Sequence, residues 1–352
     1  MRTTDKKRIK AIVAAAAVSG LSVAAAMGAA ALYDACFPRF ERPDYSITPG
    51  LCNYELVKDE LPRREISYPS GKVILKGYYY QAENSKGLVV LTHGLHAGAD
   101  DYLFVIRYLV RKNYSVFAYD GCGTYSSGGK STVGMCQALV DLDNTLAYIQ
   151  DSDEFKNMPL LLLGHSCGGY AATSVLALKG NIRACAAVAP VNDCYHLIVD
   201  KGRQYAGEIA SDGLPHVFLD VYQKILFGKY TECSGVKGIN STDIPVLVAH
   251  GNRDMIISFS GQSVISHRVE ITNPNTEYYI GTGAESGHET ILFSSRAVGY
   301  RKQVARDVKR LGKEPAHEQL QAFYAGVDNE LYSEINETLF SEITELFDRA
   351  VK

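Results

Sequence analysis

A serine between glycines is the first feature of this 352-residue chain that could carry out chemistry. Ser166 stands in the pentapeptide GHSCG at 164–168, directly after the apolar run PLLLL at 159–163 and before a helical pattern. A serine on a tight turn between a buried strand and a helix needs neighbours without side chains, because the backbone there is strained and closely packed. Ser166 is therefore the predicted nucleophile.

Asp254 and His288 are the predicted partners of Ser166. A hydroxyl is a weak nucleophile at its own pKa, so a base must take its proton and a carboxylate must hold that base in the correct tautomer. Asp254 follows the strand-like run 244–249, and His288 follows a last predicted strand at 277–280. All three side chains would emerge at one edge of a parallel sheet, where ligands bind in open α/β proteins.

Acyl transfer also needs donors for the oxyanion that forms on attack, and backbone amides serve well because they are fixed in place. One predicted donor is the amide of Cys167, which follows the nucleophile at the start of a helix. The other is the amide of Leu95 in the loop HGLHAG at 93–98, where Gly94 lets the backbone turn inward. The Cys167 side chain itself is interpreted as a small buried hydrophobe.

Strand and helix patterns alternate along the chain, as a parallel sheet with helices on both faces requires. Strands are predicted at 72–80 (an outer strand), 87–92, 115–119, 159–163, 184–188, 244–249 and 277–280. Helices are predicted at about 101–111, 133–149, 169–178, 258–266 and 297–310. The stretch 191–243 contains no buried-strand run but repeats apolar residues at helical spacing, so it is predicted to be a helical cap.

These motifs together resemble the α/β-hydrolase superfamily, specifically its monoacylglycerol-lipase-like and serine-aminopeptidase-like branch. They are, in chain order, His93-Gly94, GHSCG at 164–168, HGNRD at 250–254 and Gly287-His288. The stretch DGCGTYSSG at 120–128 is similar to the loop after the fourth strand in that branch. The resemblance implies a triad of Ser166, Asp254 and His288, and a cap between the sixth and seventh strands. Cys122 and Tyr125 depart from the polar pairs common at their positions in the branch.

The expected domain organisation follows from these patterns. Residues 39–62 suit a linker or an irregular wrap around the body, and 63–352 is the expected α/β-hydrolase domain, with the cap at about 191–243. An apolar stripe predicts a C-terminal amphipathic helix at about 329–350 that docks on its own domain.

The first 38 residues are predicted to be a signal peptide or a signal-anchor helix. Basic residues cluster at 2–10 and precede an uncharged stretch at 11–33 that is long enough to cross a hydrocarbon core. Three alanines at 29–31 offer a cleavage site for a signal peptidase. The catalytic domain is therefore expected to be membrane-anchored and outside the cytoplasm, with membrane association through this segment, or secreted.

Composition excludes several other classes of function. The net charge of −3 and the lack of a long basic run make nucleic acid an unsuitable partner, because its binding depends on phosphate neutralisation. Eight cysteines lack any paired C-x-x-C spacing, so neither a metal site nor a cofactor is expected. A Cys36–Cys52 disulfide and eight free thiols both remain open. The expected partner is a small-molecule ester or acyl substrate.

The sequence thus predicts a serine hydrolase that acts on carboxylic esters through an acyl-enzyme intermediate. One alternative is a serine aminopeptidase-like enzyme, which would need a cap carboxylate such as Glu208 to bind a free ammonium group. Another is a non-catalytic binding protein on the same scaffold. Asp193 and Asp220 are weaker alternatives for the acid, because neither follows a predicted buried strand.

Overall fold

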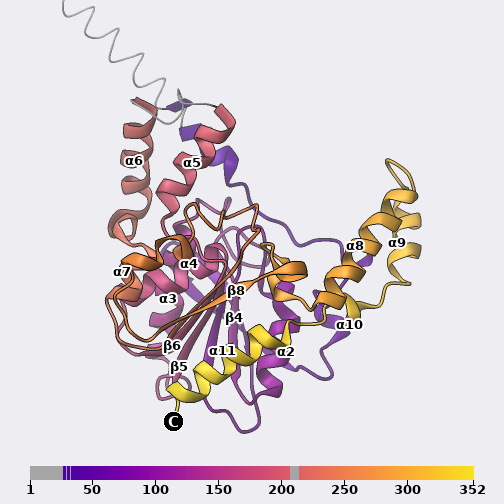
Figure 1. Ribbon diagram of the computed structural model, residues 1–352, viewed down its shortest axis with the longest axis horizontal. Helices are drawn as coiled ribbons and strands as arrows, with labels where there is room; N and C mark the ends of the chain where they lie inside the picture. Colours follow the sequence, from indigo (N-terminus) through magenta and orange to yellow (C-terminus); the bar gives the residue numbers. More distant parts are fainter. Residues whose placement is uncertain (1–26, 29, 32, 207–213) are drawn as a thin grey trace, which may run out of the picture.

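The central sheet has the strand order β1-β2-β4-β3-β5-β6-β7-β8. The computed structural model describes residues 27–28, 30–31, 33–206 and 214–352 (Figure 1). The pairs β1·β2 and β2·β4 are antiparallel, and every later pair is parallel. The prediction of a mostly parallel α/β sheet with helices on both faces and a helical insertion is therefore confirmed.

The elements have the following bounds. The strands are β1 (Arg63–Ser70), β2 (Val73–Tyr80), β3 (Leu88–Thr92), β4 (Ser115–Asp120), β5 (Leu160–His165), β6 (Ile182–Val188), β7 (Val246–Gly251) and β8 (Thr276–Gly281). The α-helices are α2 (Leu103–Arg111), α3 (Gln137–Asp151), α4 (Cys167–Ser174), α5 (Cys194–Ala206), α6 (Leu214–Phe227), α7 (Gly235–Asn240), α8 (Ser295–Arg310), α9 (His317–Tyr324), α10 (Asn329–Tyr332) and α11 (Glu337–Ala350). Short 3-10 helices include η1 (Tyr45–Ile47), η2 (Tyr54–Leu56), η3 (Ala99–Tyr102) and η7 (Val264–Glu270).

Two hydrophobic cores lie on the two faces of the sheet. On one face, α3, α4 and α7 pack against side chains such as Val90, Leu162 and Val248. On the other face, α2 and α11 pack against the alternate side chains of the same strands, such as Leu91 and Leu163. Because successive strand residues point to opposite faces, a strand covered on both sides must be apolar throughout, as β3 and β5 are.

The structure differs from the predicted elements in three places. The outer strand is β1, which the sequence did not predict, and β2 lies inside it. The helix expected at 258–266 is wrong: the chain forms the 3-10 helix η7 slightly later, capped by the side chain of Ser263. The C-terminal stripe forms two helices, α10 and α11, because Asn336 accepts a hydrogen bond from the amide of Leu339 and starts a new helix there.

Residues 39–62, which we call the strap, cross the body in a largely irregular conformation. The Arg39 guanidinium donates to main-chain oxygens of the loop after β4, including those of Ser127 at 3.0 Å and Gly129 at 2.9 Å. Further along the strap, the amide of Leu51 donates to the Ser333 hydroxyl at 2.8 Å. Leu51 is itself buried in the core of the α2 and α11 face. The strap therefore joins the β4 side of the body to the α10 region.

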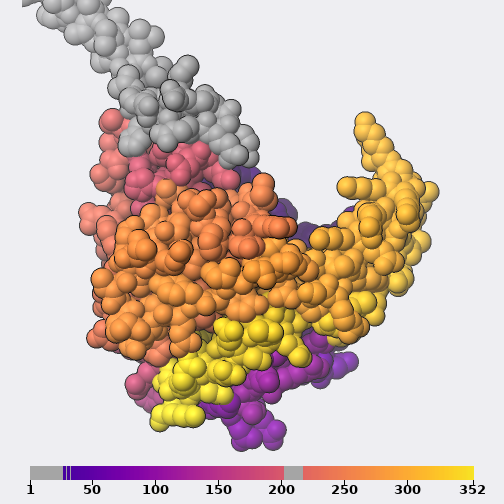
Figure 2. All heavy atoms as spheres, in the orientation of Figure 1, coloured from indigo at the N-terminus to yellow at the C-terminus, as the bar shows by residue number. Residues whose placement is uncertain are grey.

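The cap, residues 191–243, contains α5, α6 and α7 and connects β6 to β7. In Figure 1, α5 and α6 lie above the sheet, whereas α8, α9 and α10 lie to its right. Figure 2 shows α8 and α9 projecting from the body as an arm. Cap and arm therefore lie at different sides of the sheet.

Candidate active site

Ser166 lies on a sharp turn between β5 and α4. Its φ of 57° and ψ of −118° are rare for a residue with a side chain, and they make the residue the N-cap of α4. A β-carbon at Gly164 would lie 2.2 Å from the Gly168 carbonyl oxygen, and one at Gly168 would lie 2.1 Å from the Thr92 carbonyl oxygen. Only glycines fit at these two positions, so the turn can hold Ser166 close to β3.

The structure brings the three residues of the predicted triad together. His288 Nε2 lies 2.9 Å from Ser166 Oγ, and His288 Nδ1 lies 2.7 Å from Asp254 Oδ2. Each residue follows a different strand of the sheet, namely β5, β7 and β8. Asp193 and Asp220, the alternative acids, instead contact His196 and Lys224 in the cap. The arrangement can pass a proton from the serine hydroxyl to the imidazole.

Asp254 is held in its charged form by several donors. Burial favours the neutral acid, but hydrogen bonds from His250 and His288 outweigh it and hold the pKa of Asp254 well below its usual range. The amides of Ile256 and Ile257 donate to Oδ1 at 2.8 and 2.9 Å. Oδ2 is thus left for two imidazoles, His288 Nδ1 at 2.7 Å and His250 Nε2 at 3.2 Å, and the shorter contact fixes the orientation of the His288 ring.

The amides of Leu95 and Cys167 border the serine. Neither donates a main-chain hydrogen bond to another described residue, so both are open to an acceptor. Leu95 lines the same cavity as Ser166. The thiol of Cys167 donates to the Met135 carbonyl oxygen at 3.2 Å and is buried. Two amides without a main-chain acceptor therefore lie near the Ser166 hydroxyl, one in the Leu95 loop and one at the start of α4.

His93 shapes the loop that carries Leu95. His93 Nδ1 donates to the Gly94 carbonyl oxygen at 2.7 Å, and Nε2 accepts from the Gly121 amide at 2.9 Å. Both ring nitrogens are therefore committed to the main chain. The His93 ring ties the loop after β3 to the loop after β4.

Tyr102 and His165 form a second link between these loops, and no sequence motif marks Tyr102 as part of it. The Tyr102 hydroxyl accepts from the Gly94 amide at 3.0 Å and donates to His165 Nδ1 at 2.8 Å. His165 Nε2 then donates to the carbonyl oxygen of His288 at 3.2 Å. Burial lowers the pKa of His165 to about 4, so the ring is neutral at neutral pH. The chain of bonds connects the Leu95 loop to the main chain of the triad histidine.

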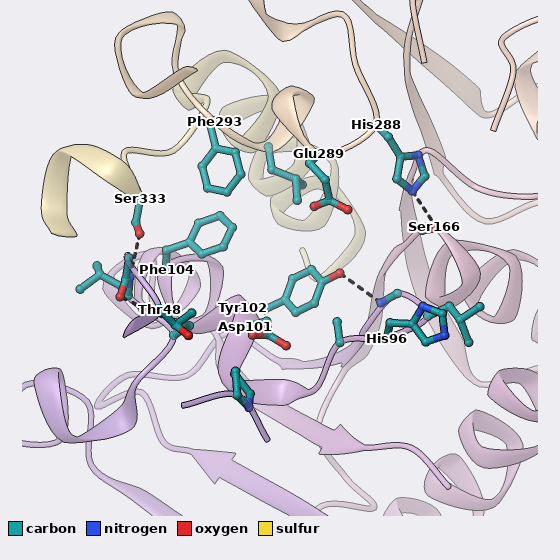
Figure 3. Close-up of a pocket in the computed structure, with 18 of the residues that line it drawn as sticks. Thr48, His96, Asp101, Tyr102, Phe104, Ser166, His288, Glu289, Phe293 and Ser333 are labelled. Carbon is teal, nitrogen blue, oxygen red and sulfur yellow. Dashed lines mark hydrogen bonds between the residues drawn. The ribbon is translucent and has the colours of Figure 1, made fainter. Parts of the chain in front are cut away.

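A cavity of about 640 Å³ opens onto Ser166. Figure 3 shows Ser166 and His288 at one end and Ser333 at the other, with Tyr102 and Phe293 between them. The strap, the Leu95 loop and the α8–α10 region line it, and none of the described cap residues does. The strap therefore forms part of the cavity wall, whereas the described residues of the cap do not.

One group of side chains has the geometry of a metal site. His165, His288 and Glu289 each place a ligand atom within 4.8 Å of the others. Both ring nitrogens of His165 and both of His288 already make hydrogen bonds within the protein. A metal ion would have to displace those bonds, so the group does not suit a resident metal.

The N-terminal prediction falls largely outside the described residues. Residues 1–26, 29 and 32 contain the basic cluster and most of the apolar stretch, and Glu208 also falls outside. Within the described ranges, no helix has both the length and the apolar character needed to cross a bilayer. The signal peptide or anchor, and the location of the domain, stay predictions.

All eight cysteines are free, so the structure contains no Cys36–Cys52 disulfide.

Comparisons with known proteins support the fold. Residues 83–222 match the sequence model of a family described as serine aminopeptidase, S33. No curated protein sequence matches the chain. A structure of the Pyrococcus furiosus esterase Pf2001 superposes with a TM-score of 0.54 at 19% identity, over 84% of this chain and 96% of that one. A second crystal form of that esterase gives a TM-score of 0.51 at 20% identity, over 72% and 92%. At these identities the structures establish the fold.

Proposed function

We propose that this chain is a serine hydrolase of the α/β-hydrolase superfamily and that it cleaves carboxylic esters. The observation that carries the proposal is the 2.9 Å contact between His288 Nε2 and Ser166 Oγ, with Asp254 on the other ring nitrogen. The esterase named above shares the fold and supports the choice of ester.

The proposed reaction uses each group in turn. His288 takes the hydroxyl proton while Ser166 Oγ attacks the ester carbonyl carbon, and Asp254 stabilises the imidazolium that forms. The amides of Leu95 and Cys167 donate to the oxyanion. His288 then protonates the leaving alkoxide, which departs as the alcohol. Water repeats the sequence on the acyl-enzyme, and the products are the free acid and the restored serine.

A peptidase that removes N-terminal residues is the second candidate. The description of the matching family favours it, and so does Glu289, whose carboxylate lies within 4.8 Å of a ring nitrogen of His288. The Glu289 side chain is exposed and makes no ion pair with another described residue, so it could bind the ammonium group of a peptide. Turnover of p-nitrophenyl esters against aminoacyl amides separates the two candidates.

Labelling by a serine-reactive fluorophosphonate tests the proposed nucleophile. We expect the wild type to be labelled and Ser166→Ala to lose labelling, with ester turnover reduced at least about 10⁴-fold because the attacking atom is gone. Ser258→Ala is the matched control, since Ser258 is exposed and its hydroxyl hydrogen-bonds, among the described residues, with that of Ser260 alone. If the folded wild type is neither labelled nor active, a non-catalytic binding protein is favoured instead.

A further inference from the structure

Arg301 is a cation on the wall of the catalytic cavity. It projects from α8, and its guanidinium carbon lies 3.9 Å from the ring centre of Phe293 and 4.2 Å from that of Tyr332. One nitrogen, Nη1, donates to the Tyr332 carbonyl oxygen at 3.0 Å. The two rings hold the planar group in a fixed position, because cations stack favourably on aromatic faces.

Arg301 lacks the carboxylate partner that neighbouring arginines have. On the same helix, Arg296 pairs with Glu334, and across the α10 region Arg107 pairs with Glu330. Arg301 makes no ion pair with any carboxylate in the described part of the chain, and burial lowers its pKa. A partly buried cation without a hydrogen-bonded carboxylate is costly, so an anion that enters the cavity and binds Arg301 directly would be favoured there.

The other charged side chains that line the cavity, Glu289 and Asp101, do not pair with Arg301. Glu289 lies by His288, and its charge also attracts Arg301, which partly offsets the effect of burial on the pKa of Arg301, but the two side chains form no ion pair. Asp101 accepts from the Gly98 amide and from the Tyr125 hydroxyl, both at 2.7 Å, and burial raises its pKa. Arg301 contacts Tyr332, which precedes Ser333, the residue at the far end of the cavity in Figure 3. Arg301 is therefore the positive group of the cavity wall, and its nearest negative charge, Glu289, does not form an ion pair with it.

The wall between the two ends is mostly apolar. Phe104 and Phe293 stack with ring centres 4.9 Å apart, and Leu292 and Leu51 also line the cavity. Figure 3 shows Phe104 and Phe293 between Ser333 and the triad. A substrate that fills the cavity would place methylene groups along this wall.

We infer that the substrate is an ester that carries a second, anionic group such as a carboxylate, which Arg301 binds at the end of the cavity remote from Ser166. This inference rests on the proposed ester hydrolysis and names its substrate class. The anion is separated from the ester carbonyl by an apolar spacer. Arg301 acts as a specificity residue, because it contacts the substrate away from the reacting atoms.

Paired esters test the inference on the wild type. p-Nitrophenyl monoesters of dicarboxylic acids, with spacers of increasing length, are compared with neutral esters of the same length, and the reverse arrangement places the carboxylate on the alcohol. We expect one arrangement to show a spacer length at which kcat/KM for the anionic ester exceeds that of its neutral partner by about tenfold or more, the usual gain from a charge-assisted hydrogen bond. No preference for the anionic ester at any spacer length would overturn the inference.

Variants of Arg301 identify the group responsible. Arg301→Met should reduce the anionic-to-neutral ratio of kcat/KM by about tenfold, and Arg301→Lys should restore part of it because the positive charge returns. The ratio cancels any general loss of activity. Arg296→Met, on the same helix but outside the cavity, removes an equal charge and should leave the ratio unchanged. An equal fall in both variants would mean a long-range charge effect and would contradict binding by Arg301.

Binding to an inactive protein separates this inference from the proposed chemistry. Ser166→Ala is titrated with the monoethyl ester of the best dicarboxylic acid, and its melting temperature is measured. We expect a stabilising shift that the diethyl ester does not give and that Arg301→Met removes. A shift without wild-type ester turnover would reject the esterase and keep the anion site. Turnover of neutral esters without any shift would keep the esterase and reject the anion site.

Discussion

The strap and the cap both lie against the sheet, yet only one of them forms the wall of the catalytic cavity. The strap contributes lining residues that include Phe40, Thr48 and Cys52, whereas the described residues of the cap contribute none. The strap is mostly irregular and the cap is mostly helical. Regular secondary structure therefore does not identify the segment that contacts a substrate in this chain.

The two regions also differ in how deeply their charged pairs are buried. In the strap, Arg42 donates to Asp100, and Arg63 just after the strap donates to the other oxygen of the same carboxylate. The side chains of Asp100 and Arg63 are 1% and 7% exposed. In the cap, the Lys224–Asp220 pair is 58% and 43% exposed. Water screens the second pair much more than the first.

Neutralising one carboxylate in each region should give the largest difference between them. Asp100→Asn removes the buried carboxylate that two guanidinium groups share and leaves them only the longer contacts of Arg42 with Asp120 and of Arg63 with Glu65, at 3.8 and 3.6 Å. We therefore expect the free energy of unfolding to fall by about 3 kcal/mol. Asp220→Asn should cost less than about 1 kcal/mol. Urea unfolding followed by circular dichroism measures both. Equal losses would mean that the strap is held by its apolar contacts and not by Asp100.

Acid should reveal a second difference, between a buried histidine beside the triad, His165, and an exposed histidine in the cap, His196. His165 keeps a pKa of about 4 in the folded chain against an ordinary value of 6.5. Between these values the unfolded chain binds the extra proton, so stability is complete above pH 6.5 and falls as the pH drops through 4. The full loss is about 3 kcal/mol.

His165→Gln should remove most of this pH dependence, because glutamine does not titrate. We expect the loss of unfolding free energy between pH 7 and pH 4.5 to shrink by about 2 to 3 kcal/mol in the variant. His196→Gln, in the exposed part of the cap, is the matched control and should leave the loss unchanged. A wild-type loss that persists in His165→Gln would place the acid sensitivity elsewhere in the protein.

Introducing a bulky side chain in each region should give a smaller difference. The quantity affected is the preference of the enzyme for long or short acyl chains. Thr48 lines the cavity, so Thr48→Trp should shorten the space and lower kcat/KM for long-chain relative to short-chain p-nitrophenyl esters by about tenfold. Val217 on α6 is 59% exposed, and Val217→Trp should leave the length profile unchanged. The reverse result would give the cap a direct role in substrate selection.

The sequence predicted the parts of the molecule that repeat a pattern. Continuous apolar runs located β3, β4 and β5, because a strand buried on both faces must be apolar throughout. The GHSCG turn and the positions of Asp254 and His288 after strands predicted three side chains that the fold brings within hydrogen-bond distance. Local sequence determines such features, so they need no knowledge of tertiary contacts.

The parts that were missed depend on contacts between distant segments. Only three of the eight residues of β1 are buried, so no continuous apolar run marks it. Its pairing with β2 defines it as a strand. The strap carries no periodicity, so its place beside Ser166 follows from contacts with residues more than 80 positions away, such as those of Arg39. Tyr102 and Arg301 belong to ordinary helical patterns, and only the folded chain brings them to the cavity.

The distribution of thiols makes this protein convenient to label. Cys36 is exposed, whereas the other seven cysteines are buried, and burial raises the pKa of Cys52 and Cys136 to about 12. A maleimide dye applied to the folded chain should therefore attach at one position without removal of any cysteine. That position lies three residues before the first residue of the strap, so the emission of the dye would report on movement at the entrance to this segment.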